Sequence, residues 1–238
     1  MQVDSAELTA SLRRLAARHA EGGGVIHALQ QVNQACVDLF HVGGSGIMVA
    51  DEQNITRYLT ASDGLARSLE EAESATGQGP CTEAFVNNRV VASSDVTIDG
   101  RWPALAAEIR GLGVFAVLGV PVRIGGIPVG TLDAYFESPH EWDDSERQAL
   151  ARYGDVVETV LSAALQAHTT GVLAGQLQYA LDYRVVIERA VGYLMAQDKV
   201  DAVVAFNRLR RVARSRRTKI GAVAEHVLSK GRLPAAQG

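Results

Sequence analysis

The sequence is poor in several features on which whole classes of protein depend. Among 238 residues it has two cysteines, Cys36 and Cys81, and no CxxC pair. This argues against a disulfide framework or a zinc site and fits a reducing cytoplasm. The six histidines are scattered without the spacing of metal ligands. We therefore expect no metal site.

Long hydrophobic runs and catalytic motifs are also missing. The longest apolar stretch, near Val114 to Val122, contains Gly119 and Pro121 and is too short to span a membrane. The chain begins without an apolar signal core. Neither GxSxG nor HExxH occurs. These absences predict a cytoplasmic protein that is not an enzyme and has no membrane partner.

Positive charge is concentrated near the end of the chain. From Asp198 to Arg232 there are ten Lys/Arg and three Asp/Glu, so this segment has a net charge of +7, whereas the whole chain has −4. Six of the cations lie within ten residues that hold no acid: Arg210, Arg211, Arg214, Arg216, Arg217 and Lys219. A solvated helix surface explains most charge runs, but cations this crowded repel each other and favour a polyanion as partner.

Residues 184–238 have the periodicity of three short helices. In the second, which Asp201 can cap, apolar residues recur at helical spacing while Arg210, Arg211 and Arg214 follow the opposite face. Thr218 can cap the third. The pattern predicts a small bundle with one strongly cationic side.

This segment resembles the ANTAR domain, an RNA-binding module of bacterial transcription antitermination regulators. The resemblance rests on Ile187, the run Ala190-Val191-Gly192-Tyr193-Leu194-Met195, and the pairs Ala205-Phe206, Leu209-Arg210, Ala213-Arg214 and Val223-Ala224. The family usually has Lys where this chain has Val191, so the later arginines must carry more of any RNA contact. The resemblance implies binding to RNA hairpins in nascent transcripts, through the six cations named above and Tyr193 as a candidate for base stacking. At the same spacing, Tyr193 is equally well explained as a core residue.

The preceding chain mixes helix and strand signals. Helices are expected over Asp4 to Ala20 and Val25 to Phe40, and a hairpin at Gly125-Gly126 joins the strands Val114 to Ile124 and Val129 to Phe136. We predict an α+β fold, an antiparallel sheet with helices on one face. Residues 25–165 resemble a GAF domain, a small-ligand or regulatory module, through Gly77-Gln78-Gly79-Pro80-Cys81, Glu83-Ala84, Asp95, Arg101-Trp102-Pro103, Gly113-Val114, Val120-Pro121-Val122 and Gly130-Thr131-Leu132.

A small-molecule ligand of this part has three candidate contacts, Cys81, Trp102 and Asp133. Each has a plainer explanation: Cys81 as a buried inert thiol, Trp102 as core, and Asp133 as a solvent-facing position of an alternating strand. The sequence identifies no cofactor.

The connector has the spacing of a coiled coil. A first seam runs from Leu150 to Ala167, and a second is formed by Leu173, Leu177, Ala180, Arg184, Ile187, Val191 and Leu194. The heptad register of the first seam does not continue into the second, and the break falls at Thr169-Thr170-Gly171. Because the second seam has no obvious partner within the chain, it predicts a homodimer, with Arg184 setting the register.

The expected organisation is an N-terminal helix (1–24), a GAF-like sensor (25–165), a coiled-coil connector (166–183) and an ANTAR-like module (184–238) ending in a three-helix bundle. The expected function is signal-responsive transcription antitermination through RNA hairpins. Two alternatives stay open from the residues alone: a DNA-binding transcriptional regulator, since basic helix pairs also enter major grooves, and a protein-interaction module with an acidic partner.

Overall fold

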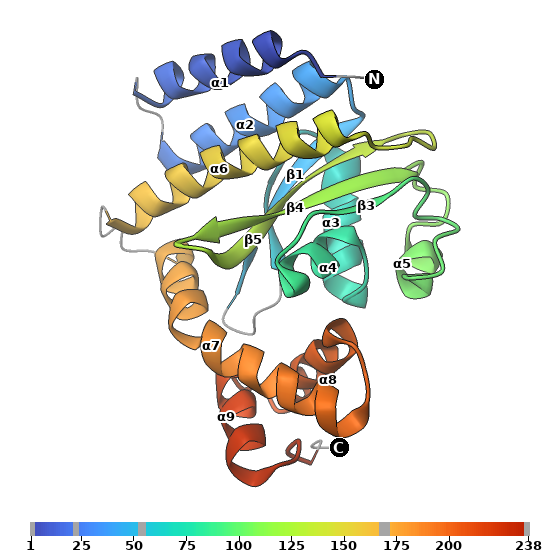
Figure 1. Cartoon of the computed structure of the whole chain (residues 1–238), viewed down its shortest axis with the longest axis vertical. Helices are drawn as coiled ribbons and strands as arrows, with labels where there is room; N and C mark the ends of the chain where they lie inside the picture. Colours follow the sequence, from blue (N-terminus) through green and yellow to red (C-terminus); the bar gives the residue numbers. More distant parts are fainter. Residues whose placement is uncertain (1–2, 21–23, 52–55, 167–171, 236–238) are drawn as a thin grey trace.

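The computed structural model describes residues 3–20, 24–51, 56–166 and 172–235. Two parts follow one another along the chain, a sheet domain and a helical bundle (Figure 1). The elements are α1 (Ser5–Ala20), α2 (Gly24–Phe40), β1 (Gly44–Ala50), β2 (Thr56–Ala61), α3 (Gly64–Thr76), α4 (Pro80–Asn87), β3 (Val91–Ser93), α5 (Pro103–Glu108), β4 (Ala116–Ile124), β5 (Ile127–Phe136), α6 (Asp144–Gln166), α7 (Val172–Asp198), α8 (Ala202–Ser215) and α9 (Ile220–Lys230).

The described strands form one antiparallel sheet in the order β2-β1-β5-β4-β3. The hairpin between β4 and β5 turns at Gly125 and Gly126, whose φ angles of 59° and 83° suit glycine. In the centre of the sheet, Asp133 of β5 lies opposite Gly46 of β1 on one side and Gly119 of β4 on the other. These two glycines leave room over Asp133 for the helices that cover this face.

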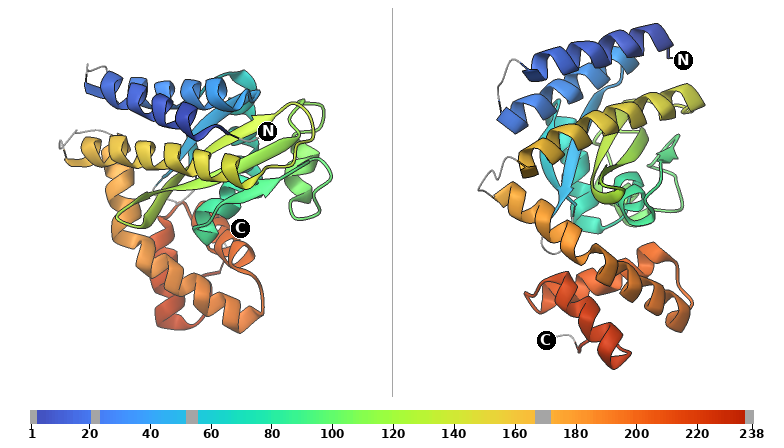
Figure 2. Two further views of the ribbon diagram at one scale, coloured as in Figure 1. Left: turned by 45° about the horizontal axis from the view of Figure 1, so that its top comes forward. Right: turned by 60° about the vertical axis from the view of Figure 1, so that its left-hand side comes forward.

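Helices cover both faces of the sheet, so the expectation of helices on one face was wrong. Side chains such as Leu118 and Leu132 pack with α2 and α6 in one core, and Val117 and Tyr135 pack with α3, α4 and α5 in another. Figure 2 shows α1, α2 and α6 stacked as one layer and the second set of helices on the opposite side. The sequence prediction missed the second layer because it did not recognise α3.

The long helix α7 joins the sheet domain to the bundle. Its first half places Leu177 and Ala180 in the core of the sheet domain, and its second half places Ile187 and Leu194 in the core of the bundle. The second heptad seam is therefore buried within the chain. The helix itself is confirmed, but its apolar stripe has an intrachain partner, so the reason for expecting a coiled-coil homodimer no longer holds. The predicted frame slip at 169–171 lies outside the described residues.

The bundle of α7, α8 and α9 has the core that periodicity predicted. Ala205, Phe206, Leu209 and Ala213 of α8 are all buried. The side chain of Asp201 caps α8 by accepting a hydrogen bond from the Val204 amide at 2.8 Å, as expected. The predicted cap at Thr218 lies one residue early, because Lys219 is the N-cap of α9.

We expect Gly221→Ala to destabilise the bundle. Gly221 lies under two stacked tyrosines, Tyr179 and Tyr183, whose ring centroids are 4.5 Å apart, and its amide donates to the Tyr179 hydroxyl at 2.9 Å. An added Cβ would overlap the Tyr183 ring, so the cost should be about 1–3 kcal/mol of unfolding free energy. Chemical denaturation measures it.

Gly192→Ala is the matched control, because Gly192 also lies in a helix but has nothing within 4 Å of an added Cβ. It should be neutral or stabilise by up to about 1 kcal/mol. Equal effects of the two substitutions would contradict the packing described for Gly221.

Candidate functional site

Most of the predicted cationic residues line the outside of α8 and the turn to α9. Arg211, Arg214, Arg217 and Lys219 are exposed and Arg216 is half-buried. Within the described residues, Arg211 and Arg214 form no ion pair with a carboxylate, so both guanidinium groups face solvent with hydrogen-bond donors available. A phosphate is a suitable partner for such groups.

Arg210 differs from its neighbours because it is buried against the sheet domain. Its side chain is on the predicted face of α8, but only 6% of the residue is exposed. Its Nη2 donates to the carbonyl oxygens of Ser74 at 2.6 Å and Ala75 at 3.4 Å. Burial, followed by the charge of Arg214, lowers the pKa of Arg210 to about 10, so it remains charged at neutral pH. In this arrangement Arg210 contacts protein and is not presented to RNA.

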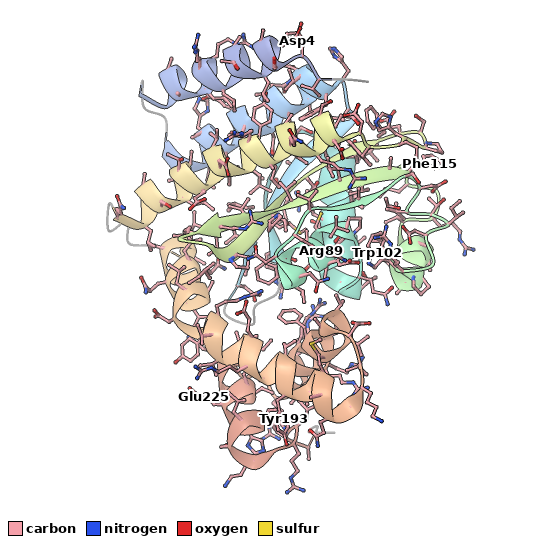
Figure 3. All side chains as sticks on the ribbon, in the orientation of Figure 1. Asp4, Arg89, Trp102, Phe115, Tyr193 and Glu225 are labelled. Atoms are coloured by element: carbon pink, nitrogen blue, oxygen red, sulfur yellow. The ribbon has the colours of Figure 1, made fainter. Side chains whose placement is uncertain are left out.

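Tyr193 lies in the bundle, away from Arg89 and Trp102 of the sheet domain (Figure 3). The residue is 41% exposed, and its hydroxyl donates to the Gly231 carbonyl oxygen at 3.3 Å. Tyr193 is thus a surface residue with an accessible ring, which fits the stacking role better than the core alternative.

Three buried carboxyl groups lie between the sheet and its second helical layer. Asp133 comes from β5, and Glu70 and Glu73 come from α3; each is 0–1% exposed. The solvent-facing explanation of Asp133 was therefore wrong. A Cβ at Gly46 would overlap Glu70 and lie 3.3 Å from Asp133 Oδ1, so the Glu70 and Asp133 carboxyl groups gather around the same glycine.

These groups differ in their partners. Glu73 accepts hydrogen bonds from the amides of Cys81 at 3.3 Å and Thr82 at 2.9 Å. In contrast, no oxygen of the Glu70 or Asp133 side chain accepts a hydrogen bond of normal length and angle from the described residues. The hydroxyls of Thr82 and Thr131 are also buried without a partner. The centre of the sheet domain therefore holds unused acceptors, which are costly to bury.

Burial is the main cause of the high pKa values in this cluster. It raises the pKa of Glu70 well above its usual value, and the charge of Asp133 adds to the increase. Burial and the charge of Glu73 raise the pKa of Asp133, an increase that the nearby Cys81 thiol and Gly46 amide partly offset. Burial also raises the pKa of Glu73 to about 7, although the hydrogen bonds from the α4 amides oppose this increase. The cluster therefore holds protons at neutral pH.

The structure brings two of the three predicted ligand contacts together and places the third in another part of the domain. Cys81 and Asp133 meet in this cluster, where burial, Asp133 and Glu73 raise the pKa of the Cys81 thiol. Cys81 is thus a buried, protonated thiol. Trp102 lies elsewhere, 2% exposed in the core beneath α5, with the Arg101 guanidinium 4.0 Å from its ring centroid. Glu70 and Glu73 were missed; their i, i+3 spacing was the signal available.

Two absences apply to the part of the chain that the structure describes. No group of three or more His, Cys, Asp or Glu side chains there is arranged to hold a metal ion. In the same ranges, no helix combines the length and apolar character needed to span a bilayer.

Comparisons with known proteins agree with both parts of the fold. Residues 25–161 match the GAF domain family and residues 175–228 match the ANTAR domain family. A search of curated proteins found no match. A GAF domain followed by an ANTAR domain is an architecture typical of regulatory proteins. The chain belongs to the GAF domain family, and an ANTAR domain follows its GAF domain.

Solved structures support the fold of the first module. The GAF domain of an Acinetobacter phosphoenolpyruvate-protein phosphotransferase is 16% identical with a TM-score of 0.55, covering 68% of this chain and 97% of that domain. Its counterpart from Coxiella burnetii is 12% identical with a TM-score of 0.55, covering 70% and 99%. The free methionine-R-sulfoxide reductase of Neisseria meningitidis is 17% identical with a TM-score of 0.52, covering 67% and 91%. At these identities the likeness concerns the fold alone.

We expect the stability of the protein to fall as the pH rises, because of Glu70 and Asp133. A group whose folded-state pKa is raised stabilises the protein fully below its unfolded-state pKa of about 4. That contribution is lost as the pH rises through the folded-state pKa. The variants Glu70→Gln and Asp133→Asn should therefore lose part of this slope, by about 1–3 kcal/mol of unfolding free energy between pH 5 and pH 8. Urea denaturation across that range provides the measurement.

Glu71→Gln serves as the control, because Glu71 lies on the same helix but is exposed and paired with Arg67. It should keep the wild-type slope. A slope that is unchanged in both cluster variants would show that these carboxyl groups do not titrate in this range.

Proposed function

We propose that this chain is a signal-responsive transcription antitermination regulator that binds RNA hairpins in nascent transcripts and so keeps a terminator from forming. The architecture of a GAF domain followed by an ANTAR domain is that of an RNA-binding antitermination regulator with a signal-sensing domain. The observation that carries the proposal is the exposed cationic surface of the ANTAR domain, formed by Arg211, Arg214, Arg217 and Lys219. The protein acts in the cytoplasm, where transcripts are made, and is not an enzyme.

The chemistry of this surface suits a folded RNA. Unpaired guanidinium groups bind backbone phosphates and release counterions, which gives affinity that decreases with salt. Loop bases that leave the stack need an aromatic platform, and the exposed ring of Tyr193 supplies one. Arg216 adds to the phosphate contacts, and Arg210 joins them once it leaves the sheet domain.

The proposal includes a homodimer, because two ANTAR domains would hold two hairpins. The buried seam of α7 does not supply the dimer contact in this conformation. Exposed apolar side chains of α7, such as Val185 and Met195, are better candidates.

The sensor part of the proposal is a small-molecule site at the centre of the GAF domain. Its support is the group of unused acceptors on Glu70, Asp133, Thr82 and Thr131, next to Cys81. Because the raised pKa values keep protons on this cluster, and because hydroxyl groups both donate and accept, a ligand that fits there must be polar and able to donate as well as accept hydrogen bonds.

We expect Arg211→Ala combined with Arg214→Ala to weaken hairpin binding and to flatten its salt dependence. Both side chains are exposed and unpaired, so their loss removes phosphate contacts without disturbing a core. The slope of log affinity against log salt should decrease in magnitude by about one for each contact removed. Titration of labelled RNA hairpins with fixed stems and randomised loops, at several salt concentrations, tests this.

The control removes two exposed arginines from the sheet domain, Arg67 on α3 and Arg152 on α6. It should leave affinity and slope unchanged. Equal losses in both double variants would indicate a nonspecific charge effect, and tighter binding of a matching DNA duplex than of the hairpins would overturn the RNA proposal.

A further inference from the structure

Two buried arginines of the ANTAR domain end on two helices of the GAF domain. Arg210 of α8 reaches the C-terminal end of α3, and Arg184 of α7 reaches the C-terminal end of α4. The last carbonyl groups of a helix have no partner within it and carry partial negative charge. Each arginine therefore supplies, from another domain, the donor that such a helix end needs.

The contact at α3 involves three carbonyl groups at the C-terminal end of the helix and its cap. Besides the bonds from Arg210 to Ser74 and Ala75, Asn207 of α8 donates through Nδ2 to the Gly77 carbonyl oxygen at 2.9 Å. Gly77 caps α3 in the left-handed conformation, with φ of 68°. A Cβ there would overlap Arg210 and lie 2.6 Å from Asn207 Oδ1. The docking of α8 thus needs a residue without a side chain at this position.

The contact at α4 combines hydrogen bonds with aromatic packing. Arg184 is 4% exposed and donates through Nη2 to the carbonyl oxygens of Phe85 at 3.3 Å and Val86 at 3.2 Å. Its guanidinium carbon lies 4.9 Å from the centroid of the Phe85 ring. The same ring meets Phe206 of α8 edge to face, at a centroid distance of 6.2 Å. Phe85 therefore belongs to the core of the ANTAR domain although it comes from the GAF domain.

The two docking points are connected within the sensor by hydrogen bonds between α3 and α4. The Glu73 side chain on α3 holds the amino-terminal amides of α4, so a shift of one helix carries the other. Glu73 is also part of the buried carboxyl cluster, and its own carbonyl accepts the capping bond from the Gly77 amide at 2.8 Å. A change in what the cluster binds reaches both docking points through α3.

The docked arrangement and RNA need the same side chains. A cavity of about 450 Å³ between α3 and α8 is lined by Gln78 and by four arginines, Arg208, Arg210, Arg211 and Arg214. With α8 docked, Arg210 is bound to carbonyl groups, and the end of α3 stands beside the remaining arginines. RNA phosphates that approach α8 must compete with the sensor domain for this face.

We propose that the GAF domain restrains the ANTAR domain in a closed form, with Arg210 and Arg184 as the latch, and that the signal opens it to let RNA bind α8. This inference rests on the proposed function. Among the residues that the structure describes, neither latch arginine has a buried carboxylate partner: Arg210 bonds to carbonyl groups, and Arg184 adds an ion pair with Glu188, whose side chain is 55% exposed. Desolvation offsets much of what such contacts gain, so the docking is reversible. The apparent RNA affinity is reduced by the fraction of molecules that are open.

The test opens the latch from the sensor side, without touching the RNA-binding surface. Gly77→Asn keeps a residue that tolerates positive φ but places a side chain where Arg210 and Asn207 dock. Gly111→Asn is the matched control, because Gly111 has φ of 79° and nothing within 4 Å of an added Cβ. Phe85→Ala is a second opening variant that removes the ring between Arg184 and Phe206. All are made in the full chain and checked for folding by thermal denaturation.

Two readouts are measured: the radius of gyration by small-angle scattering, and the affinity for labelled RNA hairpins with fixed stems and randomised loops. We expect both opening variants to expand the chain and to bind hairpins about fivefold or more tightly, the range of typical coupling between sites. The control should match the wild type in both readouts.

Failure of the latch and failure of the proposed function give different results. If folded Gly77→Asn and Phe85→Ala both keep the wild-type radius of gyration, or expand without a gain in hairpin affinity while the wild type binds hairpins, the restraint is overturned. If the opened variants and the wild type all fail to bind hairpins, the RNA function itself is overturned.

Discussion

The structure depends on the burial of one apolar stripe of α7 in two different cores. Leu177 and Ala180 belong to the sheet domain and Ile187 and Leu194 to the bundle, so a single continuous helix fixes how the two modules face each other. Burial of a leucine or isoleucine side chain is worth about 1.5–3 kcal/mol. Because bending the helix would expose part of the stripe, burial favours the closed form, in which α8 lies next to α3 and α4 and the arginine contacts form.

The centre of the sensor domain contributes less stability than an apolar core would. Glu70 and Asp133 fill the space above Gly46 with acceptors that receive no hydrogen bond of normal length and angle from the described residues. An apolar pair of the same volume would pack at lower cost, and polar groups kept in such positions commonly mark functional sites. The same helix that carries Glu70 and Glu73 ends in the carbonyl groups that bind Arg210, so the costly centre and the domain contact lie on one element.

Much of the fold followed from the sequence, because its patterns were local. The β4–β5 hairpin was marked by Gly125-Gly126, and the apolar face of α8 and its Asp201 cap followed helical spacing. The helix α3 was missed because two of its buried positions are glutamates, which break the apolar period that identifies a helix. The seam of α7 was recognised, but its partner was assigned to a second chain, since periodicity shows that a face is buried and not what buries it. Arg210 looked identical to Arg214 in sequence; only the position of α3 separates them.

The burial of both native thiols has a practical consequence. Cys36 and Cys81 lie inside the sheet domain with pKa values raised by burial, so neither reacts readily with thiol reagents while the protein is folded. A pair of cysteines introduced on the surfaces of α6 and α9 can therefore carry fluorescent dyes in the otherwise natural chain. Energy transfer between such dyes would follow the distance between the two modules in real time, as candidate metabolites are added one by one.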